Sequence, residues 1–403
     1  MPGAFAQSPA MCEAKVLEGL GWQLLTAAVA QPRIEAGAPC DRADLPAAQA
    51  AGDLRVLVPA HYDLAQHPEL VRELLQHPAT RCAFGFELGA ATRRATRRLQ
   101  DNSHYRFSAL QLGWIGFGMG GAQAQGWQRF RSFGRGYAPL GSNSRALETF
   151  YSGRVRSECG VGRQVAQLAT LRELFGDAAF DQAFTAGELS IGTFLTLHDT
   201  PSVLLGASAG ERFADGKAQK TARLGRQAFV GAPGFIEHVF DRSHLDDIHN
   251  QAENFVITDV SAAAAAALAR HDGFAHYDRL NRRIWEIATQ MPGTGRRRFE
   301  RLLYERDRAL RQALPAAQQP LLRQLDQLLA DPFYAGFEIY VHPKGVRPVG
   351  YHIVRLLDRN PRTPYSLNLA LHNLPTTIWQ RWLHARVDHC GAAGSAVHPP
   401  PPQ

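Results

Sequence analysis

The sequence predicts an α+β protein in which an antiparallel sheet packs against helices. Stretches with strand character come in clusters separated by helical stretches, whereas a doubly wound sheet would alternate strands and helices regularly. The 403 residues are 45% hydrophobic and 20% charged. A chain of this composition buries a sizeable core and is not globally disordered.

We expect three parts along the chain. Residues 1–31 are predicted to be a helical segment, built on an amphipathic helix over 16–30. Glu18 interrupts the apolar run of that helix, which does not fit a secretory signal. Residues 53–390 are expected to form the main α+β domain. Residues 391–403, with four consecutive prolines, are predicted to be a disordered tail.

Local patterns predict the first elements of the main domain. Leu54 to Pro59 alternates as a short strand does, and Pro68 to Gln76 has the proline-first start of a helix. Leu110 to Tyr137 is rich in glycine and aromatic residues but does not match GxxxxGK[ST] or GxGxxG, so we interpret it as packed loop rather than a phosphate cradle. Gly160 to Phe175 has one apolar side and predicts a helix closed by Gly176.

The second half of the chain is expected to supply most of the sheet. Phe229 to Val239 and Glu253 to Asp259 are predicted strands, and Ser261 is expected to cap the helix that follows the second of them. Residues 277–330 are polar and helical in pattern, and we expect them to form a helical insertion. Three later runs, Phe337 to His342, Tyr351 to Leu357 and Tyr365 to His372, predict an antiparallel meander.

The charge of the chain suits an acidic partner only weakly. The net charge is +7, but 40 of the 44 basic residues are arginine, a bias more typical of a GC-rich bacterial genome than of selection for phosphate contacts. The region with the most arginine is the predicted insertion, where acidic residues are interleaved and can pair with it. Its arginines are Arg296, Arg297, Arg298, Arg301, Arg306, Arg308 and Arg311. The alternative function is a non-enzymatic protein that binds nucleic acid or another polyanion through this helical stripe, Arg296 to Arg311.

The five cysteines predict neither a disulfide framework nor a structural zinc site, because none of them are arranged in CxxC or a similar short spacing. We expect reduced thiols. The cluster His244, Asp246, Asp247 and His249 is interpreted as solvated surface rather than a metal site. No apolar run approaches the ~20 residues that cross a bilayer. We expect a cytoplasmic protein, or one exported without a clear cleavable signal, and no cofactor.

Cys159 is the strongest candidate for chemistry. It stands in Ser157-Glu158-Cys159-Gly160-Val161-Gly162, at the first turn of the predicted helix. Free backbone N–H groups and the helix dipole at such a position stabilise a thiolate. The two glycines leave space for a carbonyl substrate, and the Cys159 N–H is placed to bind an oxyanion. The motif therefore predicts a nucleophilic cysteine.

This arrangement resembles the papain-like fold, particularly its transglutaminase-like branch, in which a cysteine begins a helix packed on an antiparallel sheet. The resemblance covers one short motif and the chain order. It implies a histidine and then an Asp or Asn on successive strands. Papain-like proteases place a glutamine shortly before the cysteine, where this chain has Arg154, Val155 and Arg156, so acyl transfer or deamidation is favoured over proteolysis.

The histidine partner is chosen from several candidates that the resemblance allows. We favour His238 with Asp259, because Asp259 is the lone acid at the end of an apolar strand. His352 with Asn373 is the second pair, and His249 and His198 are further alternatives. The sequence thus predicts a cysteine acyltransferase or amidohydrolase acting on a carboxamide of a protein, such as glutamine, or of a small molecule.

Overall fold

A computed structural model describes residues 9–36, 54–107, 126–132, 134–192, 197, 200–206, 210–213, 229–237, 252–271, 275–291, 297–357, 369–372 and 374–392. The chain forms two compact units. One combines Met1–Glu87 with Pro375–Gln403, and the other is Leu88–Leu374. This division differs from the expected domain boundaries, because a C-terminal helix belongs with the N-terminal elements.

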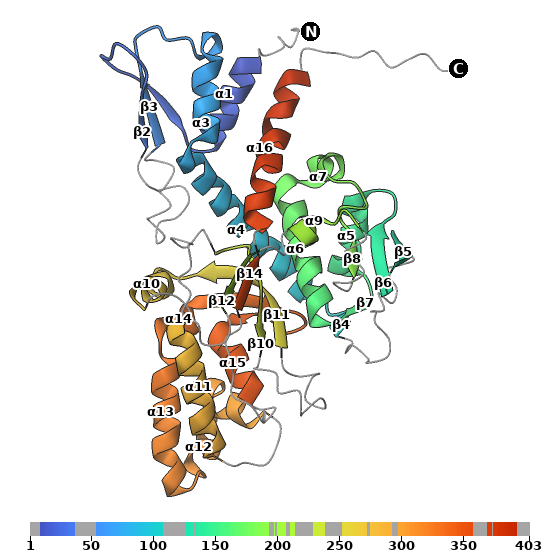
Figure 1. Cartoon of the computed structure of the whole chain (residues 1–403), viewed down its shortest axis with the longest axis vertical. Coiled ribbons are helices and arrows are strands. Elements are labelled where there is room, and N and C mark those ends of the chain that lie inside the picture. Colours follow the sequence, from blue (N-terminus) through green and yellow to red (C-terminus); the bar gives the residue numbers. More distant parts are fainter. Residues whose placement is uncertain are drawn as a thin grey trace. The chain divides into compact units, whose positions relative to one another are not determined.

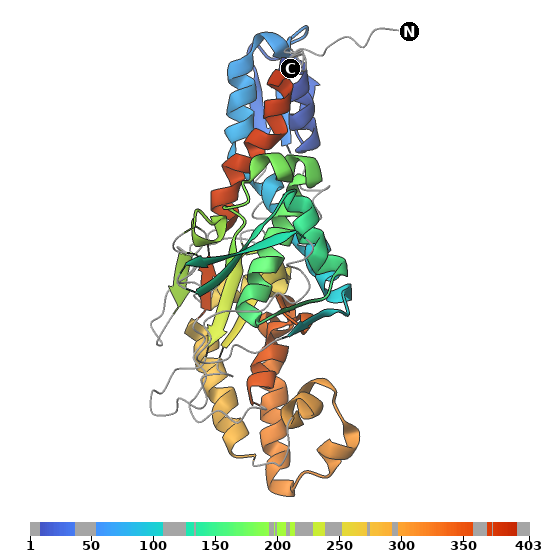
Figure 2. The ribbon, with the colours of Figure 1, turned by 90° about the vertical axis from the view of Figure 1, so that its right-hand side faces the viewer.

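The first unit packs helices against a small sheet. The sheet has strand order β1-β3-β2, with β1 and β3 parallel and β2 and β3 antiparallel. Figure 2 shows helices α1, α3 and α16 of this unit side by side. Its elements are α1 (Pro9–Gly19), β1 (Gln23–Thr26), β2 (Arg33–Ala36), β3 (Leu54–Val58), a 3-10 turn at Leu64–Gln66, α3 (Pro68–Gln76), the first part of α4 (Pro78–Asp101), and α16 (Leu374–Ala392).

Distant segments of the chain close the core of the first unit. The ring of Phe84 in α4 meets the rings of Trp379 and Trp382 in α16 at centroid distances of 5.4 and 5.1 Å. Cys12 in α1 and Cys390 in α16 form a disulfide across 378 residues of sequence. The expectation of reduced thiols is therefore wrong for these two. Spacing did not reveal the bond because only the packing of α16 brings them together.

The second unit is built on a six-stranded sheet with order β13-β12-β11-β10-β14-β9, in which all neighbours are antiparallel. Figure 1 shows it with helices on both sides. The strands are β9 (Gly210–Phe213), β10 (Pro233–Glu237), β11 (Ala252–Val260), β12 (Phe337–Val341), β13 (Gly345–Pro348) and β14 (Leu369–His372). The predicted α+β class is confirmed.

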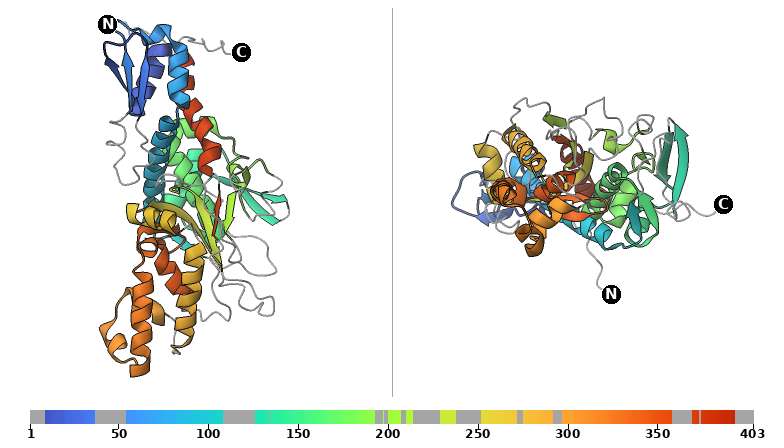
Figure 3. Two further views of the ribbon diagram at one scale, coloured as in Figure 1. Left: turned by 60° about the vertical axis from the view of Figure 1, so that its left-hand side comes forward. Right: turned by 90° about the horizontal axis from the view of Figure 1, so that it is seen from below.

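One face of this sheet carries the main apolar core. Phe255 and Ile257 of β11 and Ile339 of β12 are fully buried among helices α10, α11, α13, α14 and α15. Figure 3 shows α11 and α13 side by side in this layer. These helices span Ala262–Arg270, Ala275–Thr289, Gln319–Leu329, Pro332–Gly336 and Val349–Leu357, and between them lie a π-helical segment (Glu300–Tyr304), α12 (Arg308–Gln312) and a 3-10 turn (Ala316–Gln318).

Helix α6 (Cys159–Phe175) packs against β11 from the other face of the sheet. Successive side chains of β11 point to opposite faces, so the strand contacts the apolar core on one side and α6 on the other. The helix ends at Gly176, whose φ of 76° favours glycine. Around it lie α5 (Asn143–Ser152), α7 (Asp177–Ala183), α9 (Val203–Gly206), the parallel pair β4 (Tyr105–Phe107) and β7 (Val155–Ser157), and the antiparallel strands β5 (Trp127–Ser132), β6 (Gly134–Pro139) and β8 (Ile191–Gly192).

Several local predictions are confirmed and two are wrong. The strand at 54–58, the helix at 68–76 and strand β11 form as expected, and Ser261 caps α10 by accepting a hydrogen bond from the Ala264 N–H. The segment 16–30 instead contains the end of helix α1 and the whole of strand β1. The run Tyr351 to Leu357 is a helix, α15, so the expected meander does not form; β12 pairs with β11 and β13. No helix among the described residues has the length and apolar character of a membrane span.

Breaking the disulfide is expected to destabilise the first unit. The bond restrains an unfolded loop of several hundred residues, and the corresponding contribution to the free energy of unfolding is roughly 2–4 kcal/mol. We expect Cys12→Ser to lower the urea midpoint of that unit under oxidising conditions, while Cys159→Ser, which leaves the disulfide intact, does not. Equal midpoints for the wild type and Cys12→Ser would contradict the assignment.

Candidate active site

Cys159 is the first residue of helix α6, as the sequence predicted. The residue before it, Glu158, is the N-cap, and its carboxylate accepts hydrogen bonds of 2.6 Å from the N–H groups of both Gly160 and Val161. A carboxylate at this position satisfies two of the helix's free donors and complements the positive end of its dipole. The cap fixes where the helix starts and so fixes the position of the thiol.

The thiol of Cys159 is held by one residue of strand β11. The side-chain amide of Asn254 donates to Sγ across 3.5 Å, and the backbone of Asn254 also hydrogen-bonds the sulfur. Backbone N–H groups of a strand point within the plane of the sheet. The sulfur therefore lies beside Asn254 of β11. There the ladder between β11 and β12, which runs as far as Val256 opposite Tyr340, has ended.

His342 lies next to this position, directly after strand β12. Continuing the register from Val256 opposite Tyr340 by two residues sets His342 opposite Asn254, on the face that α6 covers. A Cβ on Gly162 would lie 2.3 Å from the Cβ of His342, so only glycine fits one helical turn beyond Cys159. The structure thus brings together Cys159, Asn254 and His342.

The surroundings of Cys159 favour its neutral thiol. Burial first, and then the charges of Glu158 and Glu253, raise the pKa of Cys159 to about 11, and the hydrogen bonds from Asn254 oppose the shift. This corrects the expectation of a thiolate stabilised by free N–H groups, because the Glu158 carboxylate occupies those of Gly160 and Val161. Forming the nucleophile therefore requires a group that accepts the thiol proton.

Glu253 is a buried carboxylate within electrostatic reach of the thiol. It precedes Asn254 in β11 and is 4% exposed. Arg355 of helix α15 donates to its Oε1 from 2.9 Å, in an ion pair that is itself largely buried. The charge of Glu253 is one of the causes that raise the pKa of Cys159.

The imidazole of His342 is buried and neutral. Burial lowers the pKa of His342 to about 4, against the opposing effect of backbone hydrogen bonds with Arg106 and Ser157. Its Nε2 lies 3.3 Å from the carbonyl oxygen of Arg106, and its ring stacks on Tyr105 with centroids 3.9 Å apart. The Tyr105 hydroxyl in turn shares a 2.7 Å hydrogen bond with Ser157. These contacts fix the ring at the base of α6.

The described part of the favoured triad does not gather at Cys159. Asp259 lies in β11 five residues beyond Asn254, roughly 15 Å along the strand. It accepts from the Val260 N–H at 2.9 Å and faces Arg93 at 4.0 Å. The expectation that Asp259 orients a histidine beside the thiol therefore does not fit the geometry.

The alternative residues divide into two groups. His352 is fully buried in α15, which packs on the face of the sheet opposite α6, so it does not meet Cys159. His198, His238, His249 and Asn373 lie outside the described residues, as does the cluster from His244 to His249. The role of these four as partners of Cys159 stays a prediction.

Sequence reasoning missed three residues around the thiol: Glu253, Asn254 and His342. Glu253 and Asn254 stand in a segment that was correctly predicted to be a strand, and His342 directly follows another. Their proximity to Cys159 depends on the pairing of β11 with β12 and on how α6 crosses them, which no local pattern encodes. One local signal was available, since an adjacent Glu and Asn at the start of an otherwise apolar strand are unusual in a core strand.

Most of the described arginines in the predicted anion-binding stripe have acidic or carbonyl partners. Arg297 pairs with Glu300 and Glu305, and Arg301 with Asp307. Further along, Arg311 pairs with Asp326, while Arg298 donates to the carbonyl of Met291. Arg296 lies outside the described residues. These contacts favour a solvated helical face held by ion pairs over a surface for polyanions.

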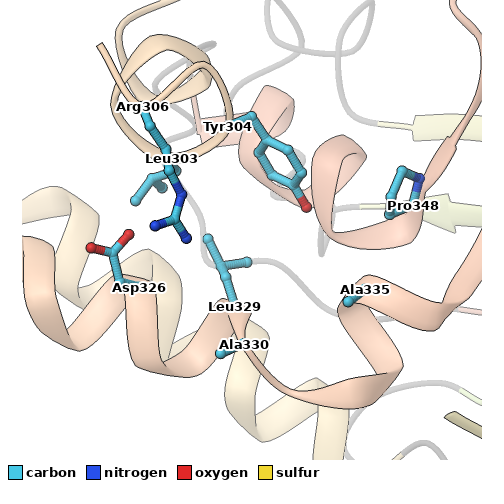
Figure 4. A pocket seen from close by; sticks show the side chains of 8 residues that line it. All are labelled: Leu303, Tyr304, Arg306, Asp326, Leu329, Ala330, Ala335 and Pro348. Carbon is cyan, nitrogen blue, oxygen red and sulfur yellow. The ribbon is translucent and has the colours of Figure 1, made fainter. Parts of the chain in front are cut away.

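The structure also has a pocket in the helical layer, which is separate from the candidate site at Cys159. It holds about 230 Å³ and is shown in Figure 4, with Arg306 and Asp326 on one side and Pro348 on the other. Asp326 already pairs with Arg311. The other lining residues are Leu303, Tyr304, Leu329, Ala330 and Ala335. None of the residues around Cys159 lines it.

Comparison with protein-family models and with curated protein sequences found no match to this chain. The candidate site therefore stands on its own geometry.

The contact between α6 and His342 can be tested by adding one methyl group. Gly162→Ala would push a Cβ against His342, and overpacking of this kind typically costs about 1–3 kcal/mol of unfolding free energy. In Gly19→Ala, at the end of α1, the new Cβ meets nothing within 4 Å, so we expect a change within about 0.5 kcal/mol. Urea unfolding followed by circular dichroism measures both. Similar stabilities for the two variants would contradict the packing.

The raised pKa predicts how Cys159 reacts with iodoacetamide. Because the pKa of Cys159 is raised to about 11, little thiolate is present at neutral pH. Labelling in the folded protein should therefore be slow at pH 7 and rise steeply above pH 9. In the urea-unfolded chain it should rise near the ~8.5 of a free thiol. Glu158→Gln removes a charge that raises the pKa, and should speed labelling at pH 8. Peptide mass spectrometry separates Cys159 from the other cysteines. Rapid labelling at pH 6 would contradict the neutral thiol.

Proposed function

We propose that the protein is a cysteine-dependent acyltransferase or amidohydrolase that acts on a carboxamide, with the glutamine side chain of a protein as the favoured substrate class. The observation that carries the proposal is the environment of one sulfur atom. Cys159 stands at the start of a buried helix, held by two hydrogen bonds from Asn254 and close to the buried Glu253. The transglutaminase-like resemblance of the sequence supports the same reaction class.

The chemistry proceeds in two steps. Cys159 gives its proton to Glu253 and its sulfur attacks the carboxamide carbon; the C–N bond then breaks, the proton passes to the leaving nitrogen, ammonia departs and a thioester remains. A primary amine then attacks the thioester to give a new amide, or water attacks to give a carboxylate. In both cases the sulfur regains a proton. Asn254 supports the first step, because its N–H groups stabilise negative charge on the sulfur.

Glu253 is assigned as proton acceptor in preference to His342. Glu253 and Asn254 are consecutive and leave the strand on opposite faces. Glu253 is nevertheless among the groups whose charge raises the pKa of Cys159. The charge of Glu253 acts directly on the thiol. The ring of His342 is turned toward the Arg106 carbonyl and stacked on Tyr105, which suits a packing role.

Deamidation or acyl transfer is favoured over proteolysis. The first glutamine after Cys159 in the same helix, Gln164, is not available to bind an oxyanion, because its amide donates to the Gly192 carbonyl at 2.8 Å and accepts from the Gly192 N–H at 2.9 Å. Gln164 instead ties α6 to strand β8. Ammonia is a small leaving group that makes few demands on such a site.

The test follows two products of one incubation. Purified protein is mixed with a glutamine-rich protein such as casein and a fluorescent primary amine, and both ammonia release and amine incorporation are measured. Cys159→Ser should abolish both signals. Glu253→Gln should lower kcat by about 100-fold or more, the usual contribution of a general base. His342→Gln should lower it by less than about tenfold.

A matched control separates catalysis from the loss of a buried ion pair. Arg355→Gln breaks the same pair with Glu253 but keeps the carboxylate, so it should keep more activity than Glu253→Gln at equal folded fraction. If His342→Gln loses more activity than Glu253→Gln, the proton acceptor is the histidine. Full activity in Cys159→Ser would end the proposal.

A further inference from the structure

Three side chains of the kind that bind metals meet at the ends of three helices in the helical layer. His271 directly follows α10, His276 lies in the first turn of α11, and Asp331 is the N-cap of α14. One ligand atom from each lies within 4.8 Å of the other two. None of these residues lies around Cys159, so a role for them is independent of the proposed function.

The framework around these side chains is rigid. Tyr277, next to His276, stacks on Phe333 with centroids 4.0 Å apart. The Tyr334 hydroxyl donates to Asn281 Oδ1 at 2.8 Å, which ties α14 to α11 a second time. Rings locked in this way hold the neighbouring His276 and Asp331 at a fixed separation.

The third ligand is tied to the same framework. The Ser261 N–H, at the start of α10, donates to the carbonyl of Gly336 at the end of α14, at 2.7 Å. A Cβ on Gly336 would lie 2.0 Å from Ser261 Oγ, so the two helices approach as closely as glycine permits. The aromatic cluster and this glycine contact therefore fix all three helices that carry the ligands.

The two imidazoles lie face to face. Their rings stack in parallel with centroids 3.8 Å apart. Neutral imidazole is the form that binds metals. The Asp331 carboxylate accepts from the Phe333 N–H at 2.9 Å through Oδ1, which orients it as second-shell hydrogen bonds orient metal-binding carboxylates.

We propose that His271, His276 and Asp331 form a binding site for a divalent transition-metal ion of the Zn²⁺ type. Two imidazoles and one carboxylate are a donor set that zinc binds, with a fourth position left for water or an exogenous ligand. Bonds of about 2.0–2.2 Å bring tetrahedral ligand atoms closer together than 4.8 Å. Binding therefore turns the two rings out of their parallel stack and toward a common centre.

The experiment is a zinc titration of the full chain. Metal is first removed with a chelator, and ZnCl2 is then titrated by isothermal calorimetry at pH 7.5. We expect one high-affinity ion per chain. His276→Gln and Asp331→Asn should each weaken binding by more than about 100-fold, since even outer-shell changes cost 10–100-fold. Asparagine is as good an N-cap as aspartate, so Asp331→Asn should keep helix α14.

The matched control is His67→Gln. His67 also pairs with a carboxylate, that of Glu69, at 3.0 Å and stacks on the ring of Tyr62. Among the described residues, however, these two side chains do not belong to a group of three metal-binding side chains. The His67→Gln variant should bind zinc with the same affinity and stoichiometry as the wild type. Circular dichroism establishes that each variant is folded. Co²⁺ provides a second readout, because its visible absorption in the wild type should be lost in His276→Gln.

Two results would overturn the proposal. One is the absence of stoichiometric zinc binding by the wild type. The other is a folded His276→Gln and a folded Asp331→Asn that bind zinc as tightly as the wild type does, which would mean that other side chains hold the ion. Affinity that falls as the pH drops from 7.5 to 5.5 is also expected, since protons compete for the imidazoles; a pH-independent affinity would count against histidine ligands.

Discussion

The close approach of helix α6 to strands β11 and β12 is the contact on which the candidate site depends. It is possible because residue 162 has no side chain and the ring of His342 occupies the space where one would lie. The same approach sets the first turn of the helix against Asn254, so the sulfur of Cys159 is placed by backbone packing and not by a flexible loop. Functional groups held by rigid elements keep a more exact geometry than those on loops.

The environment of that sulfur combines two opposing effects. Burial and two carboxylates keep the proton on the thiol, while the N–H groups of Asn254 favour its loss. A resting thiol is less exposed to oxidation and to adventitious electrophiles than a resting thiolate is. In the proposed mechanism, Glu253 takes this proton as the sulfur attacks the substrate.

Much of the fold follows from local sequence, because strands such as β11 and helices such as α6 carry strong periodicity and clear end signals. The run at 351–357 was misjudged because its β-branched and aromatic residues resemble a strand, while packing of Ile353 and Val354 into the helical core makes it a helix. Cys159 was identified from its place at a helix start. Its neighbours Glu253, Asn254 and His342 depend on strand register, which is a property of the assembled sheet.

The pairing of α1 with α16 makes the first unit discontinuous in the chain, with the second unit inserted within it. Residues 88–374 leave the ribosome before the residues that complete the first unit, so the sheet that carries β11 is able to fold while its flanking unit is still unfinished. The disulfide between Cys12 and Cys390 then encloses that insertion in a covalent ring. A single cut by a protease anywhere between these two cysteines would leave both fragments joined.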